Sequence, residues 1–309
     1  MGIMRFIPVV PSLLFVAGIF TAHAQTDPSS PTSGDLVKAI DKIIYSPEFI
    51  IENQIDSAIR TAHAAYRLSE KTGNDTLKIK SYLILGKAKI FLAEYDTALT
   101  VLSDGAARLM RINDQLLEAK YFAETGKLLK FMRDYENSLA NYIKAATIFT
   151  TLQLPDDLAV TQLGIAELFR KLGLYDKASD ALNDVKAYIE NNHPSDFVLA
   201  EYYNRMAALY NENTRPGSED SDLYFTNLAL SVSEKFCNKH LIAVSLNDIG
   251  FIYENKLRME EAMKSYIQAE QIWDELRFFR YSITAKINIA RMLNKSGKYT
   301  ASIRKLKEV

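Results

Sequence analysis

Apolar residues recur at three- and four-residue steps through nearly the whole chain from residue 36 onward, a spacing typical of amphipathic helices. This helical pattern itself repeats every 40 residues. An aromatic residue marks each repeat, with a small residue three positions later and a bulky residue four positions beyond that. Three successive repeats carry Tyr95, Ala98 and Leu102, then Tyr135, Ser138 and Tyr142, then Tyr175, Ala178 and Leu182. A fixed period of this length predicts stacked supersecondary units that bury one continuous core.

Each unit is predicted to contain two helices, with a tight turn just before the aromatic residue. Polar breaks separate one unit from the next, and their Asn and Asp residues can cap the helix that follows. These breaks lie at residues 73–75, 113–114, 155–157 and 191–194. We count seven units over residues 36–309. One unit is irregular, because residues 211–222 lengthen the turn before a helix expected over residues 223–236.

The most regular unit contains Gly250-Phe251-Ile252-Tyr253, followed by Ala262, Tyr266 and Ala269. A small residue and an aromatic on the first helix, then Ala, aromatic and Ala on the second, resembles the tetratricopeptide repeat (TPR). The resemblance implies an all-α fold, an α-solenoid of stacked helix-turn-helix repeats that forms a right-handed superhelix. It also implies that the first helix of every unit lines the concave face. Gly86 with Ala98, and Gly126 with Ser138, match the same scheme.

The period of 40 residues departs from the 34 residues usual in a TPR and is near that of HEAT and armadillo repeats. The recurring small and aromatic positions nevertheless favour the TPR. Longer-period arrays of this kind resemble those of bacterial signalling regulators and of exported sensor proteins. Because one fold serves many partners, the resemblance implies binding of a protein or peptide without specifying which. The chain stops inside its last predicted helix, which is compatible with either a truncated or a stand-alone version of such an array.

The first 24 residues predict a secretory signal peptide. Arg5 is their only charge, Phe6–Phe20 is apolar, and Ala22-His23-Ala24 supplies small residues before cleavage at Gln25. The apolar run is shorter than the roughly 20 residues that span a bilayer, which disfavours the alternative of an uncleaved anchor. Residues 25–35 are expected to be a flexible linker, and residues 36–309 the solenoid. We therefore expect a periplasmic or extracellular protein, cleaved near Ala24-Gln25, with no later membrane span.

The charge of the chain is almost balanced, with 37 Lys and Arg against 38 Asp and Glu. A nucleic-acid partner needs a concentrated basic surface, so this balance disfavours one. The charges are nevertheless arranged unevenly along the predicted first helices. Their outward positions are basic with exposed aromatics in the first half of the array and rich in Asn in the second half.

These outward positions form the candidate binding surface. They are Lys80, Lys87, Phe91, Lys120, Lys127, Lys130, Phe131, Arg170, Lys171, Asn204, Asn211, Asn247, Asn255, Arg291 and Asn294. We predict that an extended, acidic peptide or protein segment lies along them. Lys and Arg would pair with its carboxylates, and Asn would bond its backbone. The alternative is a solvated basic stripe that binds no ligand, since surface lysine is common.

Catalytic and metal-binding motifs are missing from the sequence. It holds no H-E-x-x-H, no Gly-rich phosphate loop and no G-x-S-x-G elbow, so we expect neither a cofactor nor a metal. His63, His193 and His240 do not share a ligand spacing, and His193 is expected to be exposed. Cys237 is the only cysteine, which excludes an internal disulfide, and we expect it to be buried on a helix. Trp273 is expected to pack in the core.

The favoured function is a non-catalytic, exported scaffold that binds a protein or peptide, as the sensor or partner-docking array of an envelope signalling system. A structural assembly factor for a cell-envelope complex is the alternative. An enzyme with a site across the groove is less favoured, because the sequence lacks its catalytic residues. The partner and the oligomeric state stay open at this level.

Overall fold

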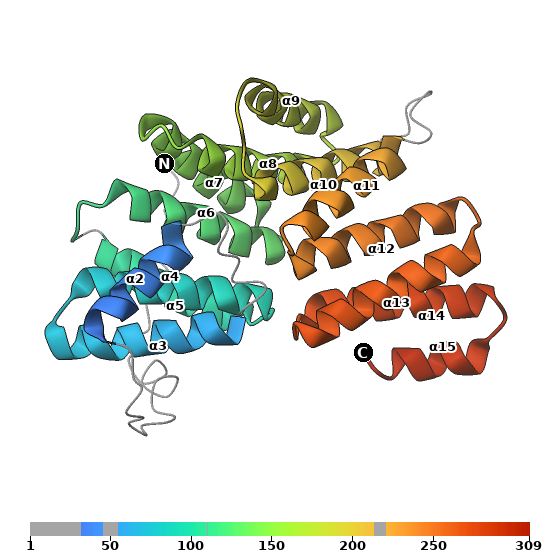
Figure 1. Cartoon of the computed structure of the whole chain (residues 1–309), viewed down its shortest axis with the longest axis horizontal. Helices are drawn as coiled ribbons and strands as arrows, with labels where there is room; N and C mark the ends of the chain where they lie inside the picture. Colours follow the sequence, from blue (N-terminus) through green and yellow to red (C-terminus); the bar gives the residue numbers. More distant parts are fainter. Residues whose placement is uncertain (1–31, 46–54, 110, 213–220) are drawn as a thin grey trace, which may run out of the picture.

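The computed structural model describes residues 32–45, 55–109, 111–212 and 221–309. Within these ranges the chain forms 14 α-helices and no strand (Figure 1). In order they are α2 (Ser33–Tyr45), α3 (Ile55–Thr72), α4 (Asp75–Phe91), α5 (Tyr95–Leu109), α6 (Gln115–Phe131), α7 (Tyr135–Thr151), α8 (Pro155–Lys171), α9 (Tyr175–Asn191), α10 (Asp196–Glu212), α11 (Ser221–Lys235), α12 (Lys239–Asn255), α13 (Met259–Glu275), α14 (Phe279–Lys295) and α15 (Tyr299–Leu306).

The helices pack in successive antiparallel pairs, from α2 with α3 to α14 with α15. We call the first helix of each pair an A helix and the second a B helix. The A helices α4, α6 and α8 begin at residues 75, 115 and 155, which confirms the predicted period of 40. The all-α solenoid expected from the sequence is confirmed. The predicted signal peptide and most of the expected linker lie outside the described residues, and α2 already begins at Ser33, inside that linker.

Short polar residues start several of the helices at the predicted breaks. Asn74 and Asp114 each accept a hydrogen bond from the backbone N–H three residues on, at 2.9 Å, and thereby cap α4 and α6. Between helices the backbone reverses through one residue of positive φ, such as Gly173 (φ 71°) before α9. These local signals fix the repeat length independently of the rest of the array.

Paired helices approach closely because small residues face bulky ones. A Cβ atom placed on Gly250 of α12 would lie 2.8 Å from the ring of Tyr266 on α13, which is fully buried. A Cβ atom placed on Gly126 would likewise lie 3.0 Å from the ring of Tyr142. The alternation of small and bulky residues seen in the sequence is therefore the interlock that sets the distance between the two helices of a pair.

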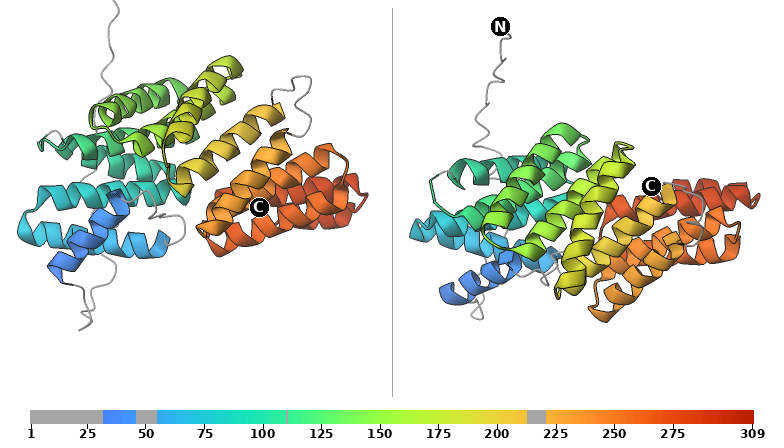
Figure 2. Two further views of the ribbon diagram at one scale, coloured as in Figure 1. Left: turned by 45° about the horizontal axis from the view of Figure 1, so that its top comes forward. Right: turned by 90° about the horizontal axis from the view of Figure 1, so that it is seen from above.

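The array curls until its first and second halves touch (Figures 1 and 2). Phe91, at the end of α4, stacks on Phe278, which precedes α14, with ring centres 5.4 Å apart. The Arg280 guanidinium lies 4.2 Å from the centre of the Phe131 ring. We call these four residues the closing contact. One hydrophobic cluster accordingly joins residues of α2–α6 with residues of α12–α14.

Single residues behave in part as expected. Trp273 is buried and His193 is exposed, as predicted. The prediction for Cys237 was wrong, because the residue is exposed in the turn before α12 with a φ of 58°. α10 ends at Glu212 and α11 begins at Ser221, so most of the predicted irregular turn lies outside the described residues. In the part of the chain that the structure describes, none of the helices is both long and apolar enough to cross a bilayer.

Candidate functional site

All six A helices from α4 to α14 contribute side chains to one cavity of about 400 Å³ at the centre of the curl. Tyr142 of α7 and Trp273 of α13 complete its wall. The cavity exists because the concave faces of the two halves turn towards each other. Residues that lie far apart in the sequence therefore meet around one volume, which makes it the candidate site.

The aromatic part of the wall adjoins the closing contact. Phe91 is only 2% exposed, so it is not the exposed aromatic that the sequence predicted. The Lys127 ammonium lies 4.0 Å from the centre of its ring. His240 packs edge-on against Phe91 and Phe278, and the Trp273 indole N–H donates to its Nδ1 at 3.1 Å. Burial, reinforced by the nearby Lys127 ammonium, lowers the pKa of His240 to about 3, so the imidazole is neutral.

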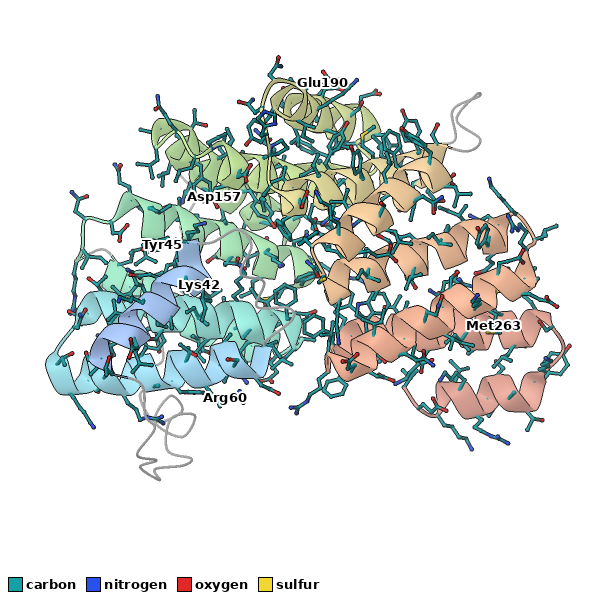
Figure 3. The ribbon with its side chains drawn as sticks, viewed as in Figure 1. Lys42, Tyr45, Arg60, Asp157, Glu190 and Met263 are labelled. Carbon is teal, nitrogen blue, oxygen red and sulfur yellow. The ribbon has the colours of Figure 1, made fainter. Side chains whose placement is uncertain are left out.

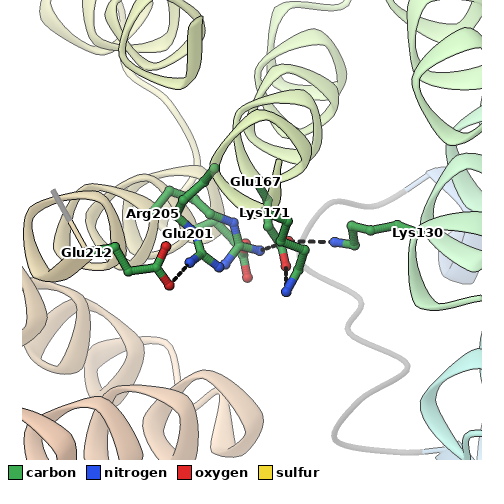
Figure 4. Close-up of polar contacts among 7 residues, drawn as sticks. Lys130, Glu167, Lys171, Glu201, Arg205 and Glu212 are labelled. Atoms are coloured by element: carbon green, nitrogen blue, oxygen red, sulfur yellow. Dashed lines mark hydrogen bonds and ion pairs between the residues drawn. The ribbon is translucent and has the colours of Figure 1, made fainter. Parts of the chain in front are cut away.

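A network of buried charges crosses the cavity from α6 to α10 (Figure 4). Glu167 of α8 accepts from Lys130 at 2.5 Å and lies 3.3 Å from Arg205, which also binds Glu201 at 2.7 Å. Burial alone would raise the pKa of Glu167, but Lys130 and Arg205 outweigh burial and hold it well below its usual range. Burial lowers the pKa of Lys130 to about 8. Lys171 approaches Glu167 at 3.9 Å.

Most of the predicted basic stripe is engaged in ion pairs between consecutive repeats. Lys87 lies 3.3 Å from Glu124, and Arg170 pairs with Glu212. Lys80 bonds Asp41 of α2 at 2.7 Å and lies over the Tyr45 ring, while Lys120 bonds Asp157 of α8 at 2.5 Å; Figure 3 labels Tyr45 and Asp157. In the second half Arg291 makes two bonds to Glu254, at 2.9 and 2.8 Å. These cations thus hold neighbouring repeats together.

Two of the predicted asparagines serve the same purpose in the second half. Ser245 donates to the side-chain oxygen of Asn204 at 3.1 Å, which links α12 to α10. The Asn288 amide donates to the side-chain oxygen of Asn247 at 3.0 Å, which links α14 to α12. Asn204 is 2% exposed and does not line the cavity. Its amide is therefore an internal tie between repeats.

The structure divides the predicted site residues into two groups. Those that line the cavity are Lys87, Phe91, Lys127, Lys130, Phe131, Lys171 and Asn247. Those that lie elsewhere on the A helices are Lys80, Lys120, Arg170, Asn204, Asn211, Asn255, Arg291 and Asn294.

Sequence reasoning missed the acids and the second-half cations of the cavity, namely Glu124, Glu201, Arg205, Asp248 and Arg280. A usable signal was present for some of them, because Lys87 and Glu124, like Lys130 and Glu167, stand 37 residues apart. Opposite charges at nearly one repeat period predict an ion pair between neighbouring A helices. Within the described ranges, no group of His, Cys, Asp or Glu is arranged to hold a metal ion.

Comparison with solved structures identifies the class of fold. The chain is similar to a Rap protein complexed with competence and sporulation factor, with a TM-score of 0.60 and 16% identity, covering 89% of this chain and 75% of that chain. It is similar to NprR in complex with its cognate peptide NprX, with a TM-score of 0.59 and 14% identity over 89% of this chain and 76% of that one. No protein-family model and no curated protein matches the chain.

A third similar structure is a signal transduction ATPase with a TPR sensor from Pyrococcus horikoshii, with a TM-score of 0.50 and 16% identity, covering 89% of this chain and 46% of that chain. At these identities the likenesses establish the fold and nothing about ligands. The chain is a TPR-type α-solenoid, closed on itself around a charged and aromatic cavity.

Proposed function

We propose that this protein is a non-catalytic receptor that binds a short peptide, or an extended segment of a protein, in the cavity enclosed by its A helices. The observation that carries the proposal is the convergence of all six A helices on one volume lined by both charged and aromatic side chains. Such a site can form hydrogen bonds with a peptide backbone and also enclose the side chains of the peptide. Two proteins of similar fold were solved with a factor or cognate peptide bound, which supports the same use here.

The charge of the cavity favours a ligand that carries an acidic group. Six cations line it against four carboxylates: Lys87, Lys127, Lys130, Lys171, Arg205 and Arg280 against Glu124, Glu167, Glu201 and Asp248. Lys127 and Arg280 form no ion pair with any described residue, and each instead lies over an aromatic ring. Their N–H groups can therefore donate hydrogen bonds to a ligand carboxylate without breaking an ion pair within the protein.

We further propose that the receptor acts outside the cytoplasm as the docking array of an envelope signalling system. The signal-peptide pattern of residues 1–24 supports export. Expression in a bacterial host followed by cell fractionation and N-terminal sequencing tests this part. A mature chain that retains Met1 in the cytoplasm would contradict it without bearing on the peptide site.

A cavity-filling substitution tests the peptide site. Val160 of α8 lines the cavity and is 36% exposed, so Val160→Trp can place an indole inside the cavity without displacing a buried core residue. Peptides are first selected by the wild-type protein from a displayed library of short random sequences. Their affinity is then measured by calorimetry, and we expect Val160→Trp to weaken binding by at least about tenfold.

Ile143→Trp is the matched control, because Ile143 of α7 is 52% exposed and lies outside the cavity. It adds the same indole to a neighbouring helix and should leave affinity unchanged. Equal loss in both variants, or selected peptides that bind Val160→Trp as well as wild type, would place the binding surface elsewhere.

A further inference from the structure

Asp248 differs from the other carboxylates of the cavity. Glu124 is paired with Lys87, Glu167 with Lys130 and Arg205, and Glu201 with Arg205. Asp248, which lines the cavity from α12, forms no ion pair with any residue that the structure describes.

The surroundings of Asp248 compensate its charge only in part. Its one hydrogen bond is a long contact of 3.4 Å from the Asn247 amide, whose oxygen in turn accepts from Asn288. Arg170 and Arg205 lie near enough to favour the carboxylate electrostatically, but Arg170 is bound to Glu212 and Arg205 to Glu201. The two guanidinium groups are thus bound to acids of α8 and α10, and the Asp248 oxygens retain capacity for a further donor.

The lack of an ion pair at Asp248 among the described residues has an electrostatic consequence. Burial raises the pKa of Asp248 to about 6, although Asn247 and the two guanidinium groups act in the opposite direction. A buried carboxylate is costly in its charged form until a cation binds beside it. A ligand cation placed here would stabilise the charged form, so the site gains most from a positively charged group.

We propose that Asp248 binds an ammonium or guanidinium group of the ligand, so that the receptor selects bipolar peptides. On this view Lys127 and Arg280 bind the acidic group of the peptide and Asp248 binds its positive group. This inference rests on the proposed function and specifies it, because a simply acidic segment would leave Asp248 unpaired. The positive group can come from a Lys or Arg side chain or from the free N-terminal amine, which offer the same chemistry to the carboxylate.

The test uses Asp248→Asn, which removes the charge and keeps the shape of the side chain. Pools of short random peptides, one with free and one with acetylated N-termini, are passed over wild type and variant, and the retained peptides are identified by mass spectrometry. Asp184→Asn is the control. Asp184 is exposed on α9, so this substitution removes one negative charge away from the cavity.

We expect wild type and Asp184→Asn to enrich positively charged peptides about tenfold over Asp248→Asn. Enrichment of Lys and Arg among acetylated peptides assigns the group to a side chain, whereas enrichment confined to free N-termini assigns it to the terminal amine. Peptides retained by wild type with no preference for a positive group would overturn the inference and leave the peptide receptor standing. A wild-type protein that retains no peptide would overturn the proposed function itself.

Discussion

At the scale of single residues, those packed between the two helices of a pair stabilise the fold, whereas charged residues on the inner face form the candidate site. Small residues such as Gly250 and Gly126 carry no chemistry but let a bulky neighbour enter the space between helices. Charged residues on the inner face carry the chemistry, and most of them are already bonded within the protein. A residue that recurs at the same position of each repeat is thus explained first by packing. Only charged residues that form no ion pair within the described protein suggest a ligand.

Gly250→Ala should destabilise the protein, because the added methyl group would meet the buried Tyr266 ring at 2.8 Å. Overpacking of this kind costs about 1–3 kcal/mol, partly offset by the better helix propensity of Ala. The measurement is the shift of the urea unfolding midpoint. Gly34→Ala in α2 is the control, since its nearest contact would be 3.9 Å away, and it should not destabilise. Equal midpoints for both variants would contradict the interlock.

At the scale of elements, ion pairs between consecutive A helices hold the solenoid in its curvature. These pairs join residues roughly one repeat apart, as in Lys120 with Asp157 and Lys130 with Glu167. The sequence was interpreted as a stripe of cations available to a ligand, and this interpretation missed the pairs because each acid lies on the A helix of the next repeat. Pairing across repeats depends on which helix faces which, and that is set only when the units stack.

Glu167→Gln should be strongly destabilising, because it leaves the buried Lys130 ammonium without its carboxylate partner and removes one of the two carboxylates that pair with Arg205. Breaking one partner of such a network costs about 3–5 kcal/mol. Hydrogen exchange should show protection lost first in α6, α8 and α10, since a repeat array opens locally. Glu190→Gln, which breaks the exposed Lys186–Glu190 pair of α9, should cost less than about 1 kcal/mol. Uniform loss of protection along the array would contradict this view.

At the scale of the whole molecule, the closing contact brings the two halves of the superhelix together around a central cavity. It joins the two ends of the array, as does the 3.4 Å ion pair of Arg277 with Asp56, residues 221 apart in sequence. His240 lies where the aromatic residues of both halves meet. We therefore expect protonation of this imidazole to weaken the contact between the two halves.

His240 should make stability fall in acid. Its folded pKa of about 3 lies below the ordinary value of 6.5, so the unfolded chain binds the proton more readily. The stability that comes from neutral His240 is complete above pH 6.5 and is lost as pH falls towards 3, at up to about 1.4 kcal/mol per pH unit. The neighbouring Lys127 and Arg205 favour the neutral form, while Glu201 opposes them.

The measurement compares unfolding free energies of wild type and His240→Phe between pH 7 and pH 4. The variant loses the hydrogen bond from Trp273 and should be less stable at pH 7, but the gap should narrow as pH falls. A gap that stays constant with pH would show that His240 has the same pKa in the folded and unfolded states, contrary to the expectation.

The sequence by itself determined the repeat, its period, the helix pairs and the caps between them. These features depend on residues within one helix pair or at its boundary, such as Asn74 with Leu77 and Gly250 with Tyr266, so spacing along the sequence suffices to predict them. Only the tertiary structure decided that Phe91 is buried, that most of the basic stripe is paired and that Asp248 is not. Those outcomes depend on the curl of the array, which sums small rotations over all repeats and brings the two halves together.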